Sequence, residues 1–361
     1  MKILTIVGAR PQFIKAAAVS RAFSKHKEIV EIIVHTGQHF DKNMSDVFFE
    51  EMQIPKPHYN LNIHGLSHGA MTGQMLEGIE KIILKENPDY VLVYGDTNST
   101  IAGALAAKKL HVKVIHVEAG LRSFNMEMPE EINRIVTDRI SDILFCPTDA
   151  AVENLKKEGM DKMQVSIIKN GDVMQDAALF YAEQAEKKST IIKDLSLNDF
   201  VLCTIHRAEN TDNVENLKNI IKGLNKINSE IQVLVPLHPR TKNILEKENI
   251  PIDFKLIEPV GYFDMIMLLK HCKLVITDSG GLQKEAFFFQ KNCVTLRNET
   301  EWVELVENGY NELAGNNSDK IYQAYQKMIV KKNDFSKNLY GNGKACDIIV
   351  DKILSHNIPV N

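Results

Sequence analysis

Short apolar runs alternate with longer helical stretches along the whole chain, and this alternation constrains the fold more than any other feature. In the first half the apolar runs are rich in Val and Ile, with helical patterns such as Gly69–Glu86 and Thr100–Leu110 between them. Strands of this kind, connected by helices, predict parallel β–α–β units with both sheet faces covered. The strands predicted here are Ile3–Val7, Glu31–Thr36, Tyr90–Tyr94, Val112–Val117 and Ile143–Cys146.

A second series of apolar runs follows a polar, helical stretch at 170–198. Its predicted strands are Phe200–Ile205, Gln232–Pro236, Phe254–Ile257, Leu274–Thr277 and Cys293–Leu296. At 361 residues, the chain is also long for one hydrophobic core. We therefore expect an α/β protein with two doubly wound domains, covering residues 1–170 and 171–340. A last helix at about 341–361 is expected to pack back on the first domain.

Composition excludes several classes of protein. A net charge of −4 argues against broad nucleic-acid binding, which needs a basic surface. No apolar run approaches the roughly 18 residues of a membrane span, and the first one is too short for a signal peptide. The five cysteines are scattered, without a C-x-x-C pair. We expect a cytoplasmic protein without a membrane or nucleic-acid partner.

Polar, charged and glycine residues follow most of the predicted strands. In open α/β sheets, ligands bind outside the carboxyl ends of the strands. Two such sets, one in each domain, predict a ligand in the cleft between the domains. The segments are 8–10, 37–39, 95–98 and 118–122 in the first half, and 206–207, 238–240 and 278–281 in the second.

The first strand ends at Gly8, and a helical pattern begins after Pro11. Arg10 and Lys15 therefore flank a strand-to-helix turn, whose backbone N–H groups and helix dipole favour an anion. The turn has neither the G-x-G-x-x-G fingerprint nor the P-loop pattern. It predicts a phosphate or diphosphate site of another kind.

A second strand-to-helix turn comprises Ser279, Gly280 and Gly281. Ser279 can cap the following helix, and the glycines let a phosphate approach the backbone. Glu285, further along this helix, could accept hydrogen bonds from ribose hydroxyls. The bland interpretation is an ordinary helix cap with a solvated glutamate.

Asp96, Glu118 and Glu130 form a set of candidate catalytic carboxylates. Asp96 and Glu118 end strands, and Glu130 lies in the first turn of a helix that starts at Pro129. Close together, they would raise one another's pKa, the usual way to obtain a carboxyl acid or base near neutral pH. Singly, each is more often structural, and Glu130 is spaced for an ion pair with Arg134.

His206 ends the first strand of the second half, where it could protonate a leaving phosphate, act as a neutral donor, or only stabilise the strand edge. His238 has the same ambiguity. The sequence has no H-E-x-x-H motif or close His/Cys/Asp cluster, which gives little support for a metal site.

The ordered motifs resemble the non-hydrolysing UDP-N-acetylglucosamine 2-epimerase family. Any one of them is weak, but the set is specific and runs through nearly the whole chain. The resemblance implies two Rossmann-like domains, as in GT-B glycosyltransferases, and a homodimer. The motifs are residues 8–11 with Lys15, 95–97, 116–122, 129–134, 206–207 and 277–283.

The family inverts C2 of a UDP-N-acetylhexosamine by eliminating UDP, forming a 2-acetamidoglucal, and adding UDP back, for cell-surface polysaccharide synthesis. No redox cofactor or metal is needed. The resemblance implies that Asp96, Glu118 and Glu130 serve C2. It places Glu285 at the ribose, and Gly261 and Met265 near the uracil. The groups implied to hold UDP are Arg10, Lys15, His206, Ser279, Gly280 and Gly281.

Three segments depart from the family pattern: Gln12-Phe13, residues 38–44 and residues 301–304. The second puts allosteric activation by UDP-N-acetylglucosamine in doubt. Together they suggest the branch that acts on UDP-2,3-diacetamido-2,3-dideoxyglucuronate in O-antigen synthesis. The C6 carboxylate of that sugar would want a further cation, for which Lys42, Arg122 and Arg139 are candidates. The motifs also leave open a hydrolysing epimerase, a GT-B glycosyltransferase and a nucleotide-sugar binding module.

Overall fold

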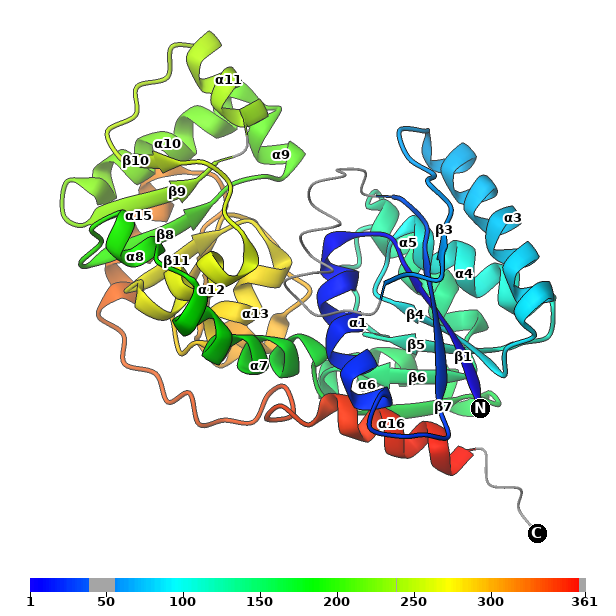
Figure 1. The fold of residues 1–361 in the computed structure, drawn as a ribbon. Helices are drawn as coiled ribbons and strands as arrows, with labels where there is room; N and C mark the ends of the chain where they lie inside the picture. Colours follow the sequence, from blue (N-terminus) through cyan, green and yellow to red (C-terminus); the bar gives the residue numbers. More distant parts are fainter. Residues whose placement is uncertain (39–55, 238, 357–361) are drawn as a thin grey trace. The chain divides into compact units, whose positions relative to one another are not determined.

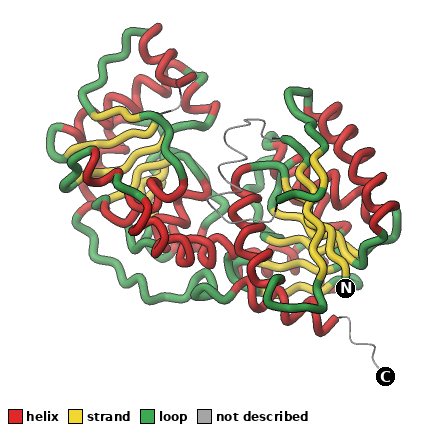
Figure 2. The backbone as a smooth tube through the Cα atoms, in the orientation of Figure 1, coloured by secondary structure: helices red, strands yellow, loops and turns green. Residues whose placement is uncertain are grey.

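Two parallel sheets, each covered by helices, form the protein (Figure 1, Figure 2). The structure is a computed structural model that describes residues 1–38, 56–237 and 239–356, except the side chains of Arg10, Pro239, Arg240 and His356. Contacts divide the chain into unit 1, Met1–Ala177 with Asn338–Asn361, and unit 2, Ala178–Lys337. No helix in the described parts of the chain is long and apolar enough to cross a membrane.

Unit 1 contains a seven-stranded sheet of order β3-β2-β1-β4-β5-β6-β7, with parallel pairing throughout. Its strands are β1 (Lys2–Val7), β2 (Val30–His35), β3 (Tyr59–Asn60), β4 (Tyr90–Tyr94), β5 (Lys113–Val117), β6 (Ile143–Cys146) and β7 (Ser166–Lys169). Its helices are α1 (Arg10–Phe23), α3 (His68–Glu86), α4 (Asn98–Lys109), α5 (Pro129–Ile140), α6 (Asp149–Lys157), the 3-10 turn η1 (Met160–Lys162) and α16 (Ala345–His356), and α7 (Val173–Lys188) leads from unit 1 into unit 2.

Both faces of the unit 1 sheet are buried, which explains the uninterrupted apolar runs. Leu4 and Ile6 of β1 pack in one core cluster with the inner faces of α3 and α4. On α3 this face includes Met75, Ile79 and Ile82, which recur at the three- and four-residue spacing of a helix. The helices α1 and α16 pack against each other, and α1 also contacts β1 and β2.

Unit 2 contains a six-stranded parallel sheet of order β10-β9-β8-β11-β12-β13. Its strands are β8 (Phe200–Thr204), β9 (Gln232–Pro236), β10 (Lys255–Ile257), β11 (Leu274–Thr277), β12 (Cys293–Thr295) and β13 (Asn311–Leu313). Its helices are α8 (Ile191–Asp194), α9 (Ala208–Thr211), α10 (Val214–Asn228), α11 (Pro239–Lys247), α12 (Tyr262–His271), α13 (Gly280–Phe288), α14 (Val303–Glu307) and α15 (Ser318–Ile329).

Alternate residues of β8 belong to opposite cores. Val201 and Cys203 pack in the cluster that includes α10 and α15, whereas Phe200 and Leu202 pack with α8 and α12. A strand buried on both faces is apolar on both, as β8 is from Phe200 to Cys203.

The predicted α/β class with two doubly wound sheets is confirmed. All ten predicted strands are present, with ends shifted by one residue at most. Three short edge strands, β3, β7 and β13, were not predicted, because they have two to four residues and are largely half-buried.

The strand order reverses between β1 and β4 in unit 1 and between β8 and β11 in unit 2. At such a switch point the connections leave toward opposite sides of the sheet, which opens a crevice at the carboxyl ends of the two strands. Gly8 and Gly95 follow the strands at the first point, and the segments after Thr204 and Thr277 lie at the second. These are the segments to which the sequence assigns function.

Candidate active site

A pocket of about 200 Å³ lies at the switch point of unit 1. Asp96 and Glu130 both line it, so the structure brings two of the three predicted carboxylates together. Asp96 follows β4, and Glu130 is exposed in the first turn of α5. Lys15 lines the same pocket from the second turn of α1.

Arg134 holds Asp96 in place. Its Nη2 lies 2.6 Å from Oδ2 of Asp96, and its Nη1 lies 2.7 Å from Oε2 of Glu131. Glu130 has the spacing for an ion pair with Arg134, but the ion pairs that Arg134 forms are with Asp96 and Glu131. Glu131 is buried and takes the guanidinium, which leaves Glu130 on the pocket wall.

Glu118 is not among the residues that line the pocket, but it pairs with Lys15, which is. The Nζ atom of Lys15 lies 2.7 Å from Oε2 of Glu118, and both side chains are nearly buried. Glu118 has φ of 72°, a conformation that residues with side chains rarely adopt. Asp96 and Glu118 each form an ion pair, with Arg134 and Lys15. Each carboxylate therefore has a cation beside it, where the sequence analysis expected repulsion between carboxylates.

The turn after β1 differs from the predicted anion site. The backbone N–H groups of Gly8 and Ala9 donate to Oε1 of Gln12, at 2.8 and 3.0 Å, so they are not left for a phosphate. The amide of Gln12 in turn donates to the Tyr94 carbonyl, at 2.8 Å. The Arg10 backbone begins α1, and its side chain lies outside the described part of the chain.

Further polar residues, to which the sequence assigned no individual role, line the pocket, and of these only His68 lies outside the segments it marked: Gln38, His68, Thr97, Asn98 and Asn133. The Nδ2 atom of Asn133 donates to the Asp96 carbonyl at 2.9 Å. Asn98 starts α4 and Asn133 follows Glu130 on α5, so both lie in segments the sequence already marks. Residues 39–44, including Lys42, lie outside the described residues.

In unit 2, Asp278 organises the predicted His206 segment. Its buried carboxylate accepts hydrogen bonds from the backbone N–H groups of His206 and Arg207, and its Oδ1 lies 3.0 Å from Nδ1 of His206. Burial raises the pKa of Asp278, but its interactions with His206, together with hydrogen bonds from Arg207 and Asn210, outweigh burial, and the pKa lies below its ordinary value. The His206 ring is thus held by Nδ1, and about half of its side chain remains exposed.

The Ser279 turn is formed as predicted for a helix cap: Ser279 Oγ accepts from the Leu282 N–H at 3.4 Å at the start of α13. On the same helix, Glu285 accepts a hydrogen bond from the Tyr262 hydroxyl at 3.2 Å. Tyr262 follows Gly261, the N-cap of α12, and Met265 lies one turn further on. The structure therefore gathers the residues predicted for ribose and uracil at the start of α12.

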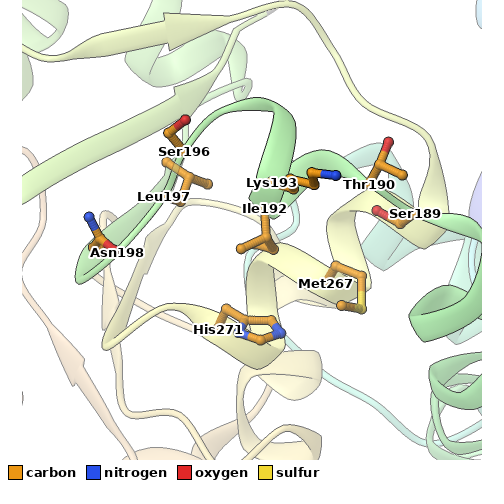
Figure 3. Close-up of a pocket in the computed structure, with 9 residues that line it drawn as sticks. All are labelled: Ser189, Thr190, Ile192, Lys193, Ser196, Leu197, Asn198, Met267 and His271. Carbon is orange, nitrogen blue, oxygen red and sulfur yellow. The ribbon is translucent and has the colours of Figure 1, made fainter.

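A larger depression in unit 2, of about 510 Å³, lies elsewhere (Figure 3). It is lined by the segment 189–198 and by Met267 and His271 near the other end of α12. None of the predicted site residues lines it. Within the described residues, no group of three or more His, Cys, Asp and Glu side chains could hold a metal ion.

The comparisons with known proteins give one answer. Residues 21–354 match the family model for UDP-N-acetylglucosamine 2-epimerase. The chain belongs to this epimerase family. It is 56% identical to the UDP-2,3-diacetamido-2,3-dideoxy-D-glucuronate 2-epimerase of Pseudomonas aeruginosa, over 97% of this chain and 99% of that protein. It is 45% identical to the crystallised UDP-GlcNAc 2-epimerase of Methanocaldococcus jannaschii, in complex with UDP-GlcNAc and UDP, with TM-score 0.90 and coverage of 99% and 100%.

The epimerase family, its GT-B-like α/β fold and its enzyme class, the isomerases, are thus those the sequence predicts. Two departures from the family pattern have visible structural roles. Gln12 ties the first turn to β4. In the 301–304 segment, the ammonium of the buried Lys284 lies over the ring of Trp302, 3.8 Å from its centroid.

Proposed function

We propose that this chain inverts C2 of a UDP-linked 2-acetamido sugar without net release of UDP. One observation carries the proposal. Asp96 and Glu130 line one pocket from two different elements, with the Lys15–Glu118 pair beside them. Inversion needs one group to take the C2 proton from one face and another to return a proton on the other face, which separate carboxylates can do.

The C2–H bond is not acidic, so the reaction proceeds by elimination. A carboxylate takes the C2 proton while the bond from C1 to the UDP oxygen breaks, giving a 2-acetamidoglucal and UDP. A second carboxylic acid then gives a proton to the opposite face of C2, and UDP adds back to C1. Atoms balance, and no oxidant or reductant enters.

The residues of unit 2 suit the nucleotide. We propose that His206 and the turn of Ser279, Gly280 and Gly281 bind the diphosphate, with Asp278 orienting His206. Glu285 would hold the ribose, with Gly261 and Met265 at the uracil. Lys15 and Arg10 remain predicted diphosphate ligands, although Lys15 also has Glu118 as a partner. Arg10→Ala should impair elimination and UDP retention.

Sequence similarity to a relative narrows the choice of sugar substrate. The relative at 56% identity acts, by its name, on UDP-2,3-diacetamido-2,3-dideoxy-D-glucuronate, which favours that sugar beside UDP-N-acetylglucosamine. Neither described candidate for its C6 carboxylate lines the pocket. Arg122 is buried and bound to Glu158 and Asp138, and Arg139 contacts Met160. Lys42 remains a prediction.

The test is incubation with each UDP-sugar in D₂O. We expect deuterium at C2 of both epimers, and faster turnover of the preferred sugar. Asp96→Asn and Glu130→Gln should lower the exchange rate by about 10²–10⁴-fold. Glu127→Gln, on an exposed residue just before α5, is the matched control and should exchange normally. No exchange with either sugar by the unaltered protein would refute the proposal.

Two further reactions are outcomes of the same experiment. Stoichiometric free UDP at early times would indicate a hydrolysing epimerase. Transfer to an acceptor without C2 exchange would indicate a glycosyltransferase. The homodimer expected from the family is checked by sedimentation of the purified protein.

A further inference from the structure

A buried histidine connects the two strand ends that carry Asp96 and Glu118. His116 lies on β5 with its side chain fully buried, and no part of it lines the pocket. Its Nε2 atom is 2.7 Å from the carbonyl oxygen of Gly95, the residue before Asp96. Its Nδ1 atom is 2.7 Å from Oδ1 of Asp138, on α5.

The geometry fixes one hydrogen of the ring. A backbone carbonyl can only accept, so Nε2 of His116 carries a hydrogen. Burial would raise the pKa of Asp138, but the hydrogen bonds and charges of His116 and Arg122 outweigh it and hold that pKa below its ordinary value. Nδ1 of the ring forms the hydrogen bond with Oδ1 of Asp138 on the other side. The ring therefore bridges the Gly95 carbonyl and the Asp138 carboxyl group.

The other oxygen of Asp138 holds the segment after Glu118. Its Oδ2 accepts from the Gly120 N–H at 3.1 Å and from Nη1 of Arg122 at 2.7 Å. Glu118 and Gly120 both have positive φ, of 72° and 79°. Such a backbone persists in a residue with a side chain only where its surroundings enforce it.

We propose that Asp138 and His116 are positioning residues for the epimerisation, fixing the Gly95–Asp96 and Glu118–Gly120 segments relative to each other. The inference rests on the proposed function, because it assigns the two carboxylates their catalytic work. It goes beyond that function because neither residue touches the pocket. Asp138 accepts directly from the Gly120 N–H, and the His116 ring, which bonds to Asp138 through Nδ1, donates from Nε2 to the Gly95 carbonyl.

Asp142 offers a matched control at the other end of β5. Asp142 accepts from the Val114 N–H at 2.8 Å and pairs with Lys108, so it also anchors β5 but at the amino end. Asp138→Asn keeps the size of the side chain but replaces one acceptor oxygen by an NH₂ group. It therefore cannot accept from both His116 and the Gly120 segment. Asp142→Asn makes the same chemical change away from the pocket.

The experiment compares the two variants by C2 deuterium exchange and by UDP affinity, with unfolding followed in parallel. For Asp138→Asn we expect kcat to fall by about 100-fold, the loss typical of a misplacement near 1 Å. KM and the UDP Kd should stay within about threefold, since binding groups are untouched. Asp142→Asn should lose stability but keep kcat. Folded Asp138→Asn with unchanged kcat would overturn the proposal.

Two measurements cover the remaining outcomes. If Asp138→Asn does not fold, His116→Gln replaces it, with the same expected split between kcat and KM. In the unaltered protein, ¹⁵N spectra of the His116 ring should show a hydrogen on Nε2, as the bond to the Gly95 carbonyl requires. An Nε2 atom without a hydrogen would refute the bridging role of the ring. Absence of exchange in the unaltered protein would refute the proposed function, while the ring spectrum would still test the hydrogen bond between His116 and Gly95.

Discussion

The ammonium of Lys15 lies 2.7 Å from a carboxylate oxygen of Glu118, with both side chains about nine-tenths buried. Removal of one partner of a buried ion pair typically costs about 3–5 kcal/mol. We predict that Lys15→Met destabilises the protein by about this amount and lowers exchange at C2. Urea unfolding and deuterium exchange measure the two effects.

The double variant distinguishes the energy of the Lys15–Glu118 ion pair from the separate contributions of the two residues. Lys15→Met with Glu118→Gln should be more stable than Lys15→Met alone, because the double variant removes both charges of the pair. It should remain inactive if Glu118 serves C2. Additive losses in the double variant would contradict an energetic coupling between the two residues.

The second prediction concerns Gln12. Its side chain satisfies two backbone N–H groups of the first turn and the carbonyl of Tyr94. Gln12→Leu has similar size but removes the acceptor of the two buried N–H groups, at about 1–3 kcal/mol for each. The Tyr94 carbonyl still accepts from the Thr100 hydroxyl at 2.6 Å. We expect a loss of at least about 2 kcal/mol of unfolding free energy. Gln323→Leu, on an exposed position of α15, should change stability little.

The strands were predictable because the apolar pattern that marks a buried strand lies within a few consecutive residues. Runs such as Tyr90–Tyr94 and Leu274–Thr277 are apolar at nearly every position, and both are strands with the predicted ends. The partners of the site residues were not predictable in this way. Arg134 is spaced for Glu130 along the helix, yet it binds Asp96, which follows β4, and Glu131. Such choices depend on which side chain the tertiary packing buries.

The same distinction applies to the first turn and to His116. Arg10, Gly8 and the helix start suggest an anion site, but Gln12 takes the backbone donors that such a site would use. His116 is part of a recognisable motif, but its bond to Gly95 depends on β4 and β5 being neighbours. Motifs identified the segments, and only the assembled sheet showed how these segments contact each other.

Acid should weaken the protein partly through Asp278. Its pKa in the folded state is lower than the ordinary value of 3.8. Its ionised form therefore stabilises the fold above the ordinary pKa, and this contribution is lost as pH falls below that value through the folded pKa. The stability difference between the unaltered protein and Asp278→Asn should shrink from about pH 5 to about pH 3. A constant difference, measured by urea unfolding at each pH, would contradict this assignment.

Gly171 and Gly341 bring two backbone segments of unit 1 into direct contact. Gly171 has φ of 89°, and a β-carbon added there would lie 2.5 Å from the Tyr340 carbonyl oxygen and 2.9 Å from the α-carbon of Gly341. Neither obstacle is a side chain that can rotate away, so Gly171→Ala must shift the backbone. We predict a loss of more than about 1 kcal/mol of unfolding free energy. Gly73→Ala, inside α3 with open space around the added methyl, should instead stabilise by about 0.5–1 kcal/mol. Thermal unfolding of both variants tests the opposite signs, and a stable Gly171→Ala protein would show that these segments are not closely packed.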